Sequence, residues 1–315
     1  MTRAIIVGAA GQDGQLLGRL LEGEGAVVLG IGREGIAVSD ERTRRPGADI
    51  LDFAAVADLV SGFGADEIYY LAAHHNSSEQ ATADDVDLMS TSLAVNVRGL
   101  TVFLESIRYR RPRARLFYAA SSHAFGRPLR APQDESTPFA PANIYGISKV
   151  AGIHTCMMYR RVHAVHASVR ILYNHESWLR REVFVTCKIV KAVGDIVRGS
   201  RRKLEIAFPE AKVDWGYAPD YVDAMRRILR CDSADDCIVA TGETHTVREF
   251  CDIAFRKAAL DYRDFVVFNA AAGVRAQPRL VGNSARLAAA TGWRPTVTFE
   301  QMVELLVEHE IARPN

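Results

Sequence analysis

The stretch GAAGQDG, residues 8–14, decides the fold of this chain. It follows RAIIV (residues 3–7), an apolar run too short for a helix, and it leads into the helical pattern QLLGRLLEGEG (residues 15–25). Strand, tight turn and helix therefore come in that order. This order is typical of the first unit of a dinucleotide-binding sheet.

The three glycines of the turn, Gly8, Gly11 and Gly14, are spaced three residues apart. Glycine permits a tight turn and lets a pyrophosphate approach the helix N-terminus, where unpaired N–H groups attract an anion. We predict that this turn binds NADP or NAD; a plain glycine-rich turn is the alternative. Arg33, after the second apolar run, could contact a 2′-phosphate and favours NADP. We also assign Asp49 to the cofactor site.

Apolar runs and helical patterns alternate through the first half of the chain. The predicted strands lie in residues 3–7, 26–31, 66–73, 113–121 and 166–174. Alternation of this kind predicts an α/β fold with a doubly wound parallel sheet of the Rossmann type. After about residue 175 the rhythm becomes irregular, which indicates a smaller C-terminal substrate-binding lobe.

We predict two domains from this pattern. Residues 1–173, with a return segment at 214–240, form the Rossmann domain, and residues 174–213 and 241–315 form the substrate lobe.

Composition excludes several classes of protein. The 315 residues include 39 basic and 38 acidic side chains, a net charge of +1, so no overall field favours nucleic acid or an anionic membrane. Five cysteines without a Cys-x-x-Cys pair fit reduced thiols in a cytoplasmic protein. We find no apolar stretch long enough for a signal peptide or a transmembrane helix, so we expect neither export nor a membrane span.

Ser121, Tyr145 and Lys149 form the predicted catalytic group. NIYGISK (residues 143–149) puts Tyr145 and Lys149 four residues apart, on one face of a helix, and Ser121 ends the preceding strand. A lysine ammonium lowers the pKa of a nearby phenol, and a serine can orient a sugar hydroxyl. With the glycine turn, this order of residues resembles the extended short-chain dehydrogenases/reductases.

The resemblance narrows to the GDP-mannose 4,6-dehydratase family, through segments that span nearly the whole chain. They are GAAGQDG (8–14), EIYYLAA (67–73), PFAPANIYGISK (138–149), NHES (174–177), FVTCKI (184–189), VDWGYAPDYVDAM (213–225), ATGETHTVREF (240–250) and TGWRPTVTFEQMVE (291–304). The resemblance implies a GDP-hexose substrate and a homo-oligomer, a dimer or tetramer.

The same resemblance implies which residues bind the nucleotide and its diphosphate. Asn174, Glu176, Lys188 and Arg275 match family positions there, and Arg180 falls on the second arginine of a family Ser-Pro-Arg-Arg-Gly run. Judged from the residues alone, Arg180 and Arg275 could equally be solvated surface charges.

The active-site segment departs from the family pattern. The family has Ser-Thr-Ser-Glu-Leu-Tyr-Gly, and this chain has ASSHAFG (residues 120–126): Ser121 stands at the threonine, His123 at the glutamate and Phe125 at the tyrosine. The carboxylate that removes water is therefore missing. Positioned proton transfer is worth about 10²- to 10⁴-fold in rate, so its loss without replacement would nearly abolish dehydration.

Three histidines are further departures. His74 and His75 follow one predicted strand and His123 follows the next, so they should meet at the carboxyl edge of the sheet where ligands bind. They could be hydrogen-bonded cleft residues, His123 could be an acid/base, or the cluster could hold a divalent metal such as manganese, cobalt or zinc.

Three functions stay open on this sequence. The leading hypothesis is a non-dehydrating isomerisation of a GDP-hexose, either an epimerisation or a pyranose–furanose interconversion, with metal assistance as one form. The alternatives are an NADP-dependent GDP-mannose 4,6-dehydratase or GDP-sugar 4-oxidoreductase that uses Ser121, Tyr145 and Lys149, and a non-catalytic nucleotide-sensing subunit.

Overall fold

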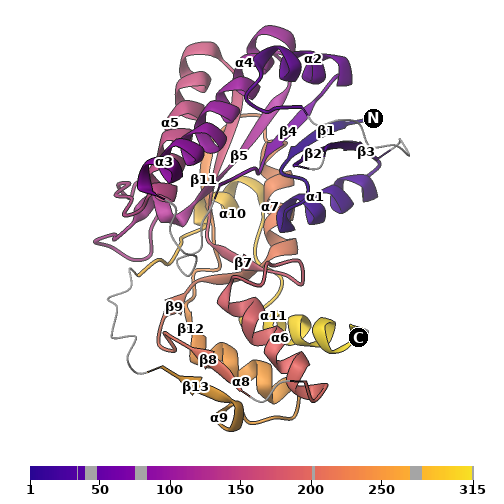
Figure 1. Ribbon diagram of the computed structural model, residues 1–315. Coiled ribbons are helices and arrows are strands. Elements are labelled where there is room, and N and C mark those ends of the chain that lie inside the picture. The colour runs from indigo at the N-terminus through magenta and orange to yellow at the C-terminus, as the bar shows by residue number, and fades with distance from the viewer. Residues whose placement is uncertain (34, 40–47, 75–83, 201–202, 270–278, 314–315) are drawn as a thin grey trace.

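The chain forms a larger lobe around a seven-stranded sheet and a smaller lobe beside the carboxyl ends of its strands (Figure 1). The computed structural model describes residues 1–33, 35–39, 48–74, 84–200, 203–269 and 279–313. From one edge to the other, the sheet contains β11 (Asp236–Val239), β6 (His166–Leu172), β5 (Arg115–Ser121), β4 (Glu67–Tyr70), β1 (Arg3–Val7), β2 (Val27–Gly32) and β3 (Gly35–Val38). The predicted fold class, α/β with a doubly wound sheet, is confirmed.

One edge of the sheet differs from the all-parallel prediction. The strands from β2 to β11 pair in parallel, but β3 runs antiparallel to β2, with Gly32 opposite Gly35. A parallel return needs a crossover of a dozen or more residues, and the connection here is far too short for one. Gly35 has a φ of 125°, a conformation that side-chain-bearing residues rarely adopt.

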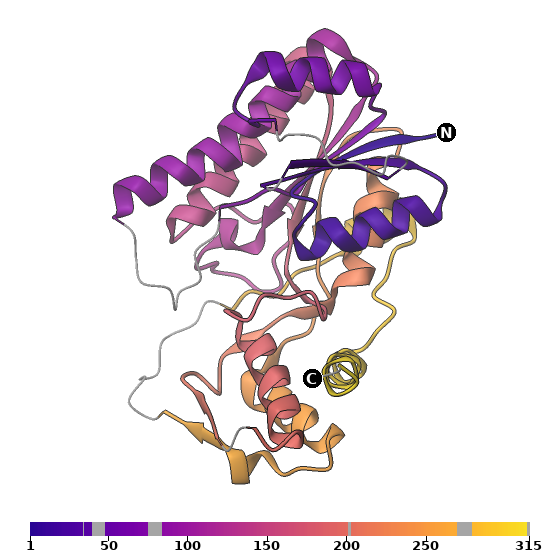
Figure 2. The ribbon, with the colours of Figure 1, turned by 45° about the vertical axis from the view of Figure 1, so that its right-hand side comes forward.

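Helices cover both faces of the sheet (Figure 2). On one face lie α2 (Phe53–Phe63), α4 (Leu100–Arg110) and α5 (Ile144–His163), and on the other lie α1 (Gln12–Gly23), α7 (Ala218–Leu229) and α10 (Ala285–Thr291). A π-helical turn, η1 (Ala94–Gly99), joins α3 (Asp85–Leu93) to α4. Each face has its own apolar core, so strands buried on both sides read as continuous apolar runs in the sequence.

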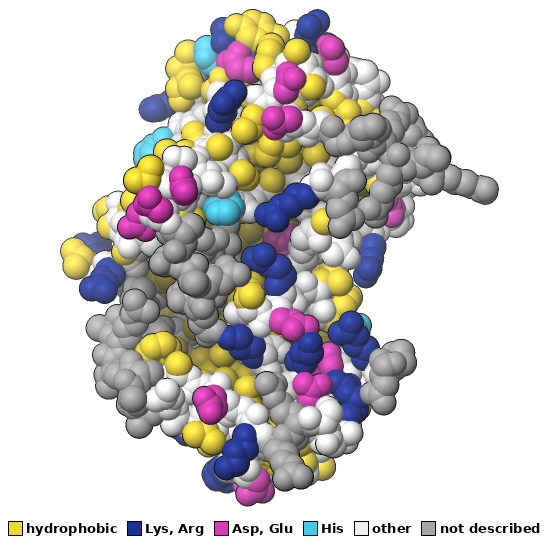
Figure 3. Space-filling model, viewed as in Figure 1, with side chains coloured by type: hydrophobic (Ala, Val, Ile, Leu, Met, Phe, Trp, Pro, Cys, Tyr) yellow, Lys and Arg dark blue, Asp and Glu magenta, His cyan; other side chains and the backbone are white. Residues whose placement is uncertain are grey.

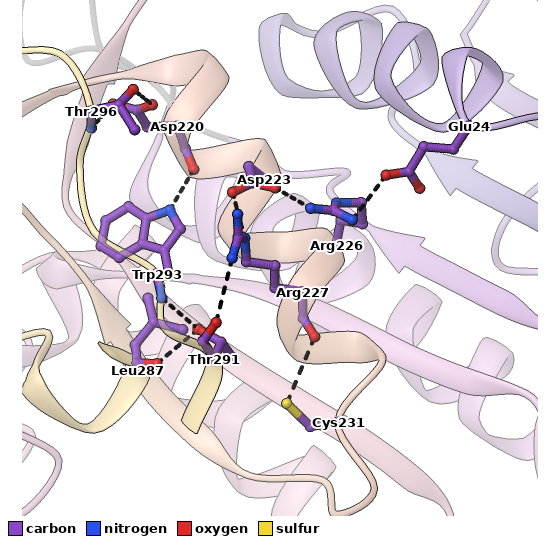
Figure 4. Close-up of polar contacts among 10 residues, drawn as sticks. All are labelled: Glu24, Asp220, Asp223, Arg226, Arg227, Cys231, Leu287, Thr291, Trp293 and Thr296. Atoms are coloured by element: carbon purple, nitrogen blue, oxygen red, sulfur yellow. Dashed lines mark hydrogen bonds and ion pairs between the residues drawn. The ribbon is translucent and has the colours of Figure 1, made fainter. Parts of the chain in front are cut away.

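Polar contacts tie the chain after α10 to α7 (Figure 4). The indole N–H of Trp293 donates to the Asp220 carbonyl at 2.9 Å, and the Thr296 hydroxyl donates to the Asp220 carboxylate at 2.6 Å. Leu287 and Trp293 are buried in the core between α7 and the sheet. This stretch therefore packs in the larger lobe, although the predicted domain division, which stays a prediction, counted it with residues 241–315.

The smaller lobe is built from short strand pairs and helices around a separate core. Its strand pairs are β7 (Asn174–Glu176) with β10 (Trp215–Tyr217), β9 (Lys212–Val213) with β12 (His245–Thr246), and β8 (Leu204–Ile206) with β13 (Val266–Phe268). Its helices are α6 (Val185–Val197), α8 (Val247–Lys257), α9 (Tyr262–Phe265) and α11 (Phe299–Ile311). All five cysteines are unpaired. None of the described helices has the length and apolar character needed to cross a membrane.

Candidate active site

The glycine turn fits the diphosphate of a dinucleotide. Gly8 has a φ of 95°, and its N–H donates to the Ile31 carbonyl at 2.8 Å. A Cβ on Gly8 would lie 2.8 Å from the Ala72 nitrogen, and one on Gly14 would lie 2.5 Å from the Gly8 carbonyl oxygen. Gly11, at the N-cap of α1, is exposed and has no side chain to bond the first N–H groups of the helix. Helix N-termini of this kind bind phosphate groups.

Two further predicted cofactor residues lie on exposed loops. Arg33 directly follows β2, where a Cβ on Gly32 would lie 3.7 Å from the Ala10 methyl group of the glycine turn. The backbone that carries Arg33 therefore passes beside the rim of that turn. Asp49 precedes α2, and its carboxylate accepts the Leu51 N–H at 2.9 Å, a local loop contact. Roles of Arg33 and Asp49 in cofactor binding stay predictions.

The predicted Ser, Tyr and Lys side chains come together between β5 and α5. The helix begins after Asn143, whose side-chain oxygen accepts the Gly146 N–H at 2.7 Å. A side-chain hydrogen bond joins Ser121, the last residue of β5, to Tyr145. The Lys149 ammonium lies 5.5 Å from the centre of the Tyr145 ring and donates to a β5 carbonyl at 2.7 Å.

Burial shifts the proton affinity of two of these groups. It raises the pKa of Tyr145 to about 12, against the opposing effects of the Ser121 hydrogen bond and the nearby Arg180 charge. Burial also lowers the pKa of Lys149 to about 7. The phenol is therefore a proton donor at neutral pH, and the amine is close to its titration midpoint. An anionic ligand beside Lys149 would favour its charged form.

His123 lies in the helical turn η2 (Ser122–Phe125), directly after β5. Its Nδ1 is 3.0 Å from the side-chain nitrogen of Asn143. The Asn143 oxygen is already bonded to Gly146, so the amide nitrogen faces His123 and donates. Nδ1 is therefore an acceptor, and the proton of the neutral ring is on Nε2. Burial lowers the pKa of His123, which is consistent with a neutral ring.

The ring of His123 also contacts the ring of Tyr145. The two rings are edge to face, with centres 5.7 Å apart. The backbone N–H of His123 donates to the Ser121 hydroxyl at 3.3 Å. A neutral imidazole thus stands beside Ser121 and Tyr145.

The predicted histidine cluster is only partly described. The backbone N–H of His74, after β4, donates to the buried Asn96 side chain at 3.2 Å, and Asn96 in turn donates to the Ser148 hydroxyl at 2.8 Å. His75 lies outside the described residues. Within the described ranges, no three His, Cys, Asp or Glu side chains gather in a way that could hold a metal. The metal prediction for His74, His75 and His123 therefore has no support from this part of the chain.

Glu176 and Arg180, both predicted to bind substrate, contact each other. Glu176 is buried, and its carboxylate accepts the Thr186 hydroxyl at 2.8 Å and lies 3.2 Å from the Arg180 guanidinium. The Phe184 ring packs 3.6 Å from the Arg180 guanidinium carbon. Glu176 and Phe184 therefore hold the Arg180 side chain in place. Asn174 begins β7 and pairs with β10.

Basic side chains gather on the smaller lobe and around the recess between the lobes (Figure 3). Lys188, half-buried on α6, belongs to the predicted nucleotide site. Arg275 lies outside the described residues. A basic surface of this kind suits a diphosphate ligand.

Sequence reasoning missed three groups. Asn143 precedes a helix, so its capping role was readable, but its second bond to His123 was not. Asp13 binds His175, and Asn96 supports the His74 loop, through contacts between residues far apart in the chain. No local pattern signals such contacts.

This arrangement, with a glycine turn before α1 and Tyr145 and Lys149 one helical turn apart beside Ser121, defines a short-chain dehydrogenase/reductase. The sequence model of GDP-mannose 4,6-dehydratases matches residues 5–306, and the chain belongs to that family.

Relatives agree over nearly the full length of the chain. GDP-mannose 4,6 dehydratase 2 of Arabidopsis thaliana is 33% identical over 98% of this chain and 86% of its own length. GDP-mannose 4,6-dehydratase of Yersinia enterocolitica is 30% identical over 99% of this chain and 94% of its own.

Solved structures share the fold. RMD from Pseudomonas aeruginosa, complexed with NADPH, has a TM-score of 0.85 at 21% identity, and all of both chains is covered. UDP-glucose 4-epimerase from Brucella ovis, complexed with NAD, has a TM-score of 0.82 at 17% identity, with 99% of both chains covered.

Proposed function

We propose that this chain is a GDP-hexose isomerase that does not dehydrate its substrate, an epimerase or a pyranose–furanose mutase. The observation that carries the proposal is the neutral His123 ring, fixed by Asn143 beside Ser121 and Tyr145. Family membership supports a GDP-sugar substrate.

Dehydration needs a group that removes a proton next to a ketone and protonates the departing hydroxyl. A carboxylate suits this step, and this chain has an imidazole in its place. Burial lowers the pKa of His123, so the ring has little tendency to take up a proton at neutral pH. Its Nε2–H can instead donate a hydrogen bond to a sugar oxygen.

The other site residues would orient the hexose without removing water. The Tyr145 phenol, protonated at neutral pH, and the Ser121 hydroxyl can bond the same sugar hydroxyl, because they already bond each other. The Nε2–H of His123 would hold a second oxygen. Arg180, positioned by Glu176, would contact the substrate diphosphate.

We propose NADP, or NAD, as the cofactor. The turn of Gly8, Gly11 and Gly14 fits its diphosphate, and Lys149 would bond its ribose. Bound, it would supply reversible hydride transfer. Arg33 at the rim of the turn favours the 2′-phosphate of NADP. Titration of the purified protein with NADPH and NADH, followed by fluorescence, tests this choice.

A second function is favoured by the intact Ser121–Tyr145–Lys149 group. Such a group serves oxidation and reduction at a sugar carbon, so an NADP-dependent GDP-sugar 4-oxidoreductase or dehydratase is the competing candidate. An epimerase would also use it, whereas a mutase would not need it.

The deciding experiment incubates the purified protein with GDP-mannose, GDP-glucose and GDP-galactose. Parallel reactions contain NADP, NAD, EDTA or Mn²⁺, Co²⁺ and Zn²⁺, and UDP- and dTDP-sugars serve as controls. Products are separated by liquid chromatography and their masses are measured by mass spectrometry. A new retention time at unchanged mass supports isomerisation, and NMR then distinguishes an epimer from a furanose. Loss of the mass of one water molecule means dehydration and refutes the proposal. If EDTA abolishes the activity and one of these ions restores it, the metal-assisted form of the proposal is supported.

A further inference from the structure

An acidic residue stands where the cofactor diphosphate should bind. Asp13 is in the first turn of α1, two residues after Gly11, and its side chain is 21% exposed. A carboxylate there is favourable for the helix itself, because it faces the positive end of the helix dipole. It would, however, repel a diphosphate at the same N-terminus. Something must cancel its charge before the turn can bind an anion.

His175 supplies the cancelling charge. Its Nε2 lies 3.0 Å from both carboxylate oxygens of Asp13, and its Nδ1 lies 2.7 Å from the Tyr173 carbonyl oxygen. The His175 charge and hydrogen bond lower the pKa of Asp13 in spite of its burial, so Asp13 is an ionised carboxylate. A carboxylate and a carbonyl can only accept, so both ring nitrogens carry a proton. A ring protonated at both nitrogens is an imidazolium. His123, with an amide donor at Nδ1, has the opposite state.

The surroundings support the charged form. Burial alone would lower the pKa of His175, but the Asp13 charge and the bonds to Asp13 and Tyr173 outweigh burial and raise it. The Tyr221 ring of α7 stacks on the imidazole at 4.5 Å. The Arg180 charge opposes the protonation of His175. Arg180 is itself paired with Glu176 at 3.2 Å, and that pair weakens its effect.

These four side chains form two neighbouring ion pairs of opposite charge. Asp13 and Glu176 contribute two negative charges, and His175 and Arg180 contribute two positive charges. Loss of the His175 charge would leave one net negative charge beside the glycine turn.

The same contact joins the two lobes. The Gln12 side chain donates to the His175 carbonyl at 3.1 Å and accepts the Ser177 hydroxyl at 2.8 Å. Gln12 and Asp13 thus hold β7, which begins at Asn174, against the turn before α1. This explains why Asp13 is found at a site that must bind a diphosphate: its partner His175 ties the smaller lobe to the glycine turn.

We infer that His175 is a positioning residue, held as an imidazolium, and that its charge makes the glycine turn able to bind the dinucleotide diphosphate by neutralising Asp13. The inference rests on the cofactor part of the proposed function. It does not require that the reaction be an isomerisation.

The test is a double-mutant cycle read by binding. NADPH and NADH affinities are measured by fluorescence at pH 7 for the wild type, His175→Asn, Asp13→Asn, the double variant, and His154→Asn as a control on the exposed face of α5. His175→Asn should weaken binding about tenfold or more, the effect of one unpaired charge close to an anion. Asp13→Asn alone should change it by less than about threefold. The double variant should recover most of the loss.

A purely structural tie between the lobes gives a different pattern. Asp13→Asn would then weaken binding as much as His175→Asn, and the double variant would recover nothing; either result overturns the inference. If His175→Asn does not fold, Asp13→Asn still decides, together with ¹⁵N NMR of the wild-type imidazole, which should show two protonated nitrogens at pH 7. A neutral His175 ring overturns the inference. A wild-type protein that binds neither dinucleotide also overturns it, while the assay with GDP-hexoses still judges the isomerase separately.

Discussion

Replacement of the buried Lys149 by methionine should stabilise the protein at neutral pH, although it removes a predicted catalytic residue. Lys149 is 1% exposed, and its ammonium has one hydrogen bond, to the Ala119 carbonyl at 2.7 Å. The Tyr118 ring, 4.9 Å from the nitrogen, offers weak additional support. An unbranched apolar side chain of similar length would fill the same volume without a charge.

The magnitude follows from the change in proton affinity on folding. In the unfolded chain Lys149 has its ordinary pKa of 10.5, and burial lowers the pKa to about 7 in the folded protein. Between these values the unfolded state binds more protons, so stability rises with pH. The cost of burying the amine is about 4 kcal/mol at pH 7 and about 2 kcal/mol at pH 9. The substitution removes that cost but leaves the Ala119 carbonyl without its donor, which costs about 1–3 kcal/mol.

Lys149→Met should therefore be more stable than the wild type by about 1–3 kcal/mol at pH 7, and the difference should vanish near pH 9. Urea unfolding at several pH values, without ligand, measures both quantities. Lys203→Met, at an exposed lysine, is the control and should show no such pH dependence. A Lys149→Met protein that is less stable than the wild type at pH 7, or a difference that does not change with pH, would refute the reasoning.

Three other substitutions test the site. Tyr145→Phe removes the phenol that bonds Ser121; an epimerase or oxidoreductase should lose at least about 10²-fold in turnover, a mutase should keep most of it, and product analysis tells these apart. His123→Glu places the carboxylate of the family pattern beside Tyr145 and should yield dehydrated product if hydride transfer is intact. If mass spectrometry shows only product of unchanged mass, residues other than His123 also prevent dehydration. Gly14→Ala would put a Cβ 2.5 Å from the Gly8 carbonyl oxygen, so NADPH affinity should fall at least about tenfold, whereas Gly23→Ala, where a Cβ meets nothing within 4 Å, should not change it.

The fold could be predicted from the sequence because the patterns that define its strands and the glycine turn are local. Apolar runs mark the parallel strands, and the glycine turn marks where the first strand meets α1. Ser121, Tyr145 and Lys149 were correctly brought together, since the end of a parallel strand and the start of the following helix share one edge of the sheet.

The protonation states of the histidines could not be predicted from local sequence patterns. Sequence placed His123 directly after the strand that ends at Ser121, and it lies there; His175, in β7, was not singled out. Their protons depend on partners elsewhere in the chain: Asn143 donates to one ring, and Asp13, 162 residues away, accepts from the other. The rings of His123 and His175 therefore have different hydrogen-bond partners, a distinction that no spacing of residues reveals.

The construction of the smaller lobe limits how enzymes of this shape can acquire new substrates. Its core is assembled from three separate stretches, 189–215, 247–266 and 302–307, and the chain between them returns to the larger sheet to form α7, β11 and α10. No single crossover between two genes could exchange the smaller lobe as a unit, because any junction would divide one core or the other. The smaller lobe therefore cannot be exchanged between related proteins as one continuous segment. Replacement of one side chain at a time, as at position 123, leaves both cores whole.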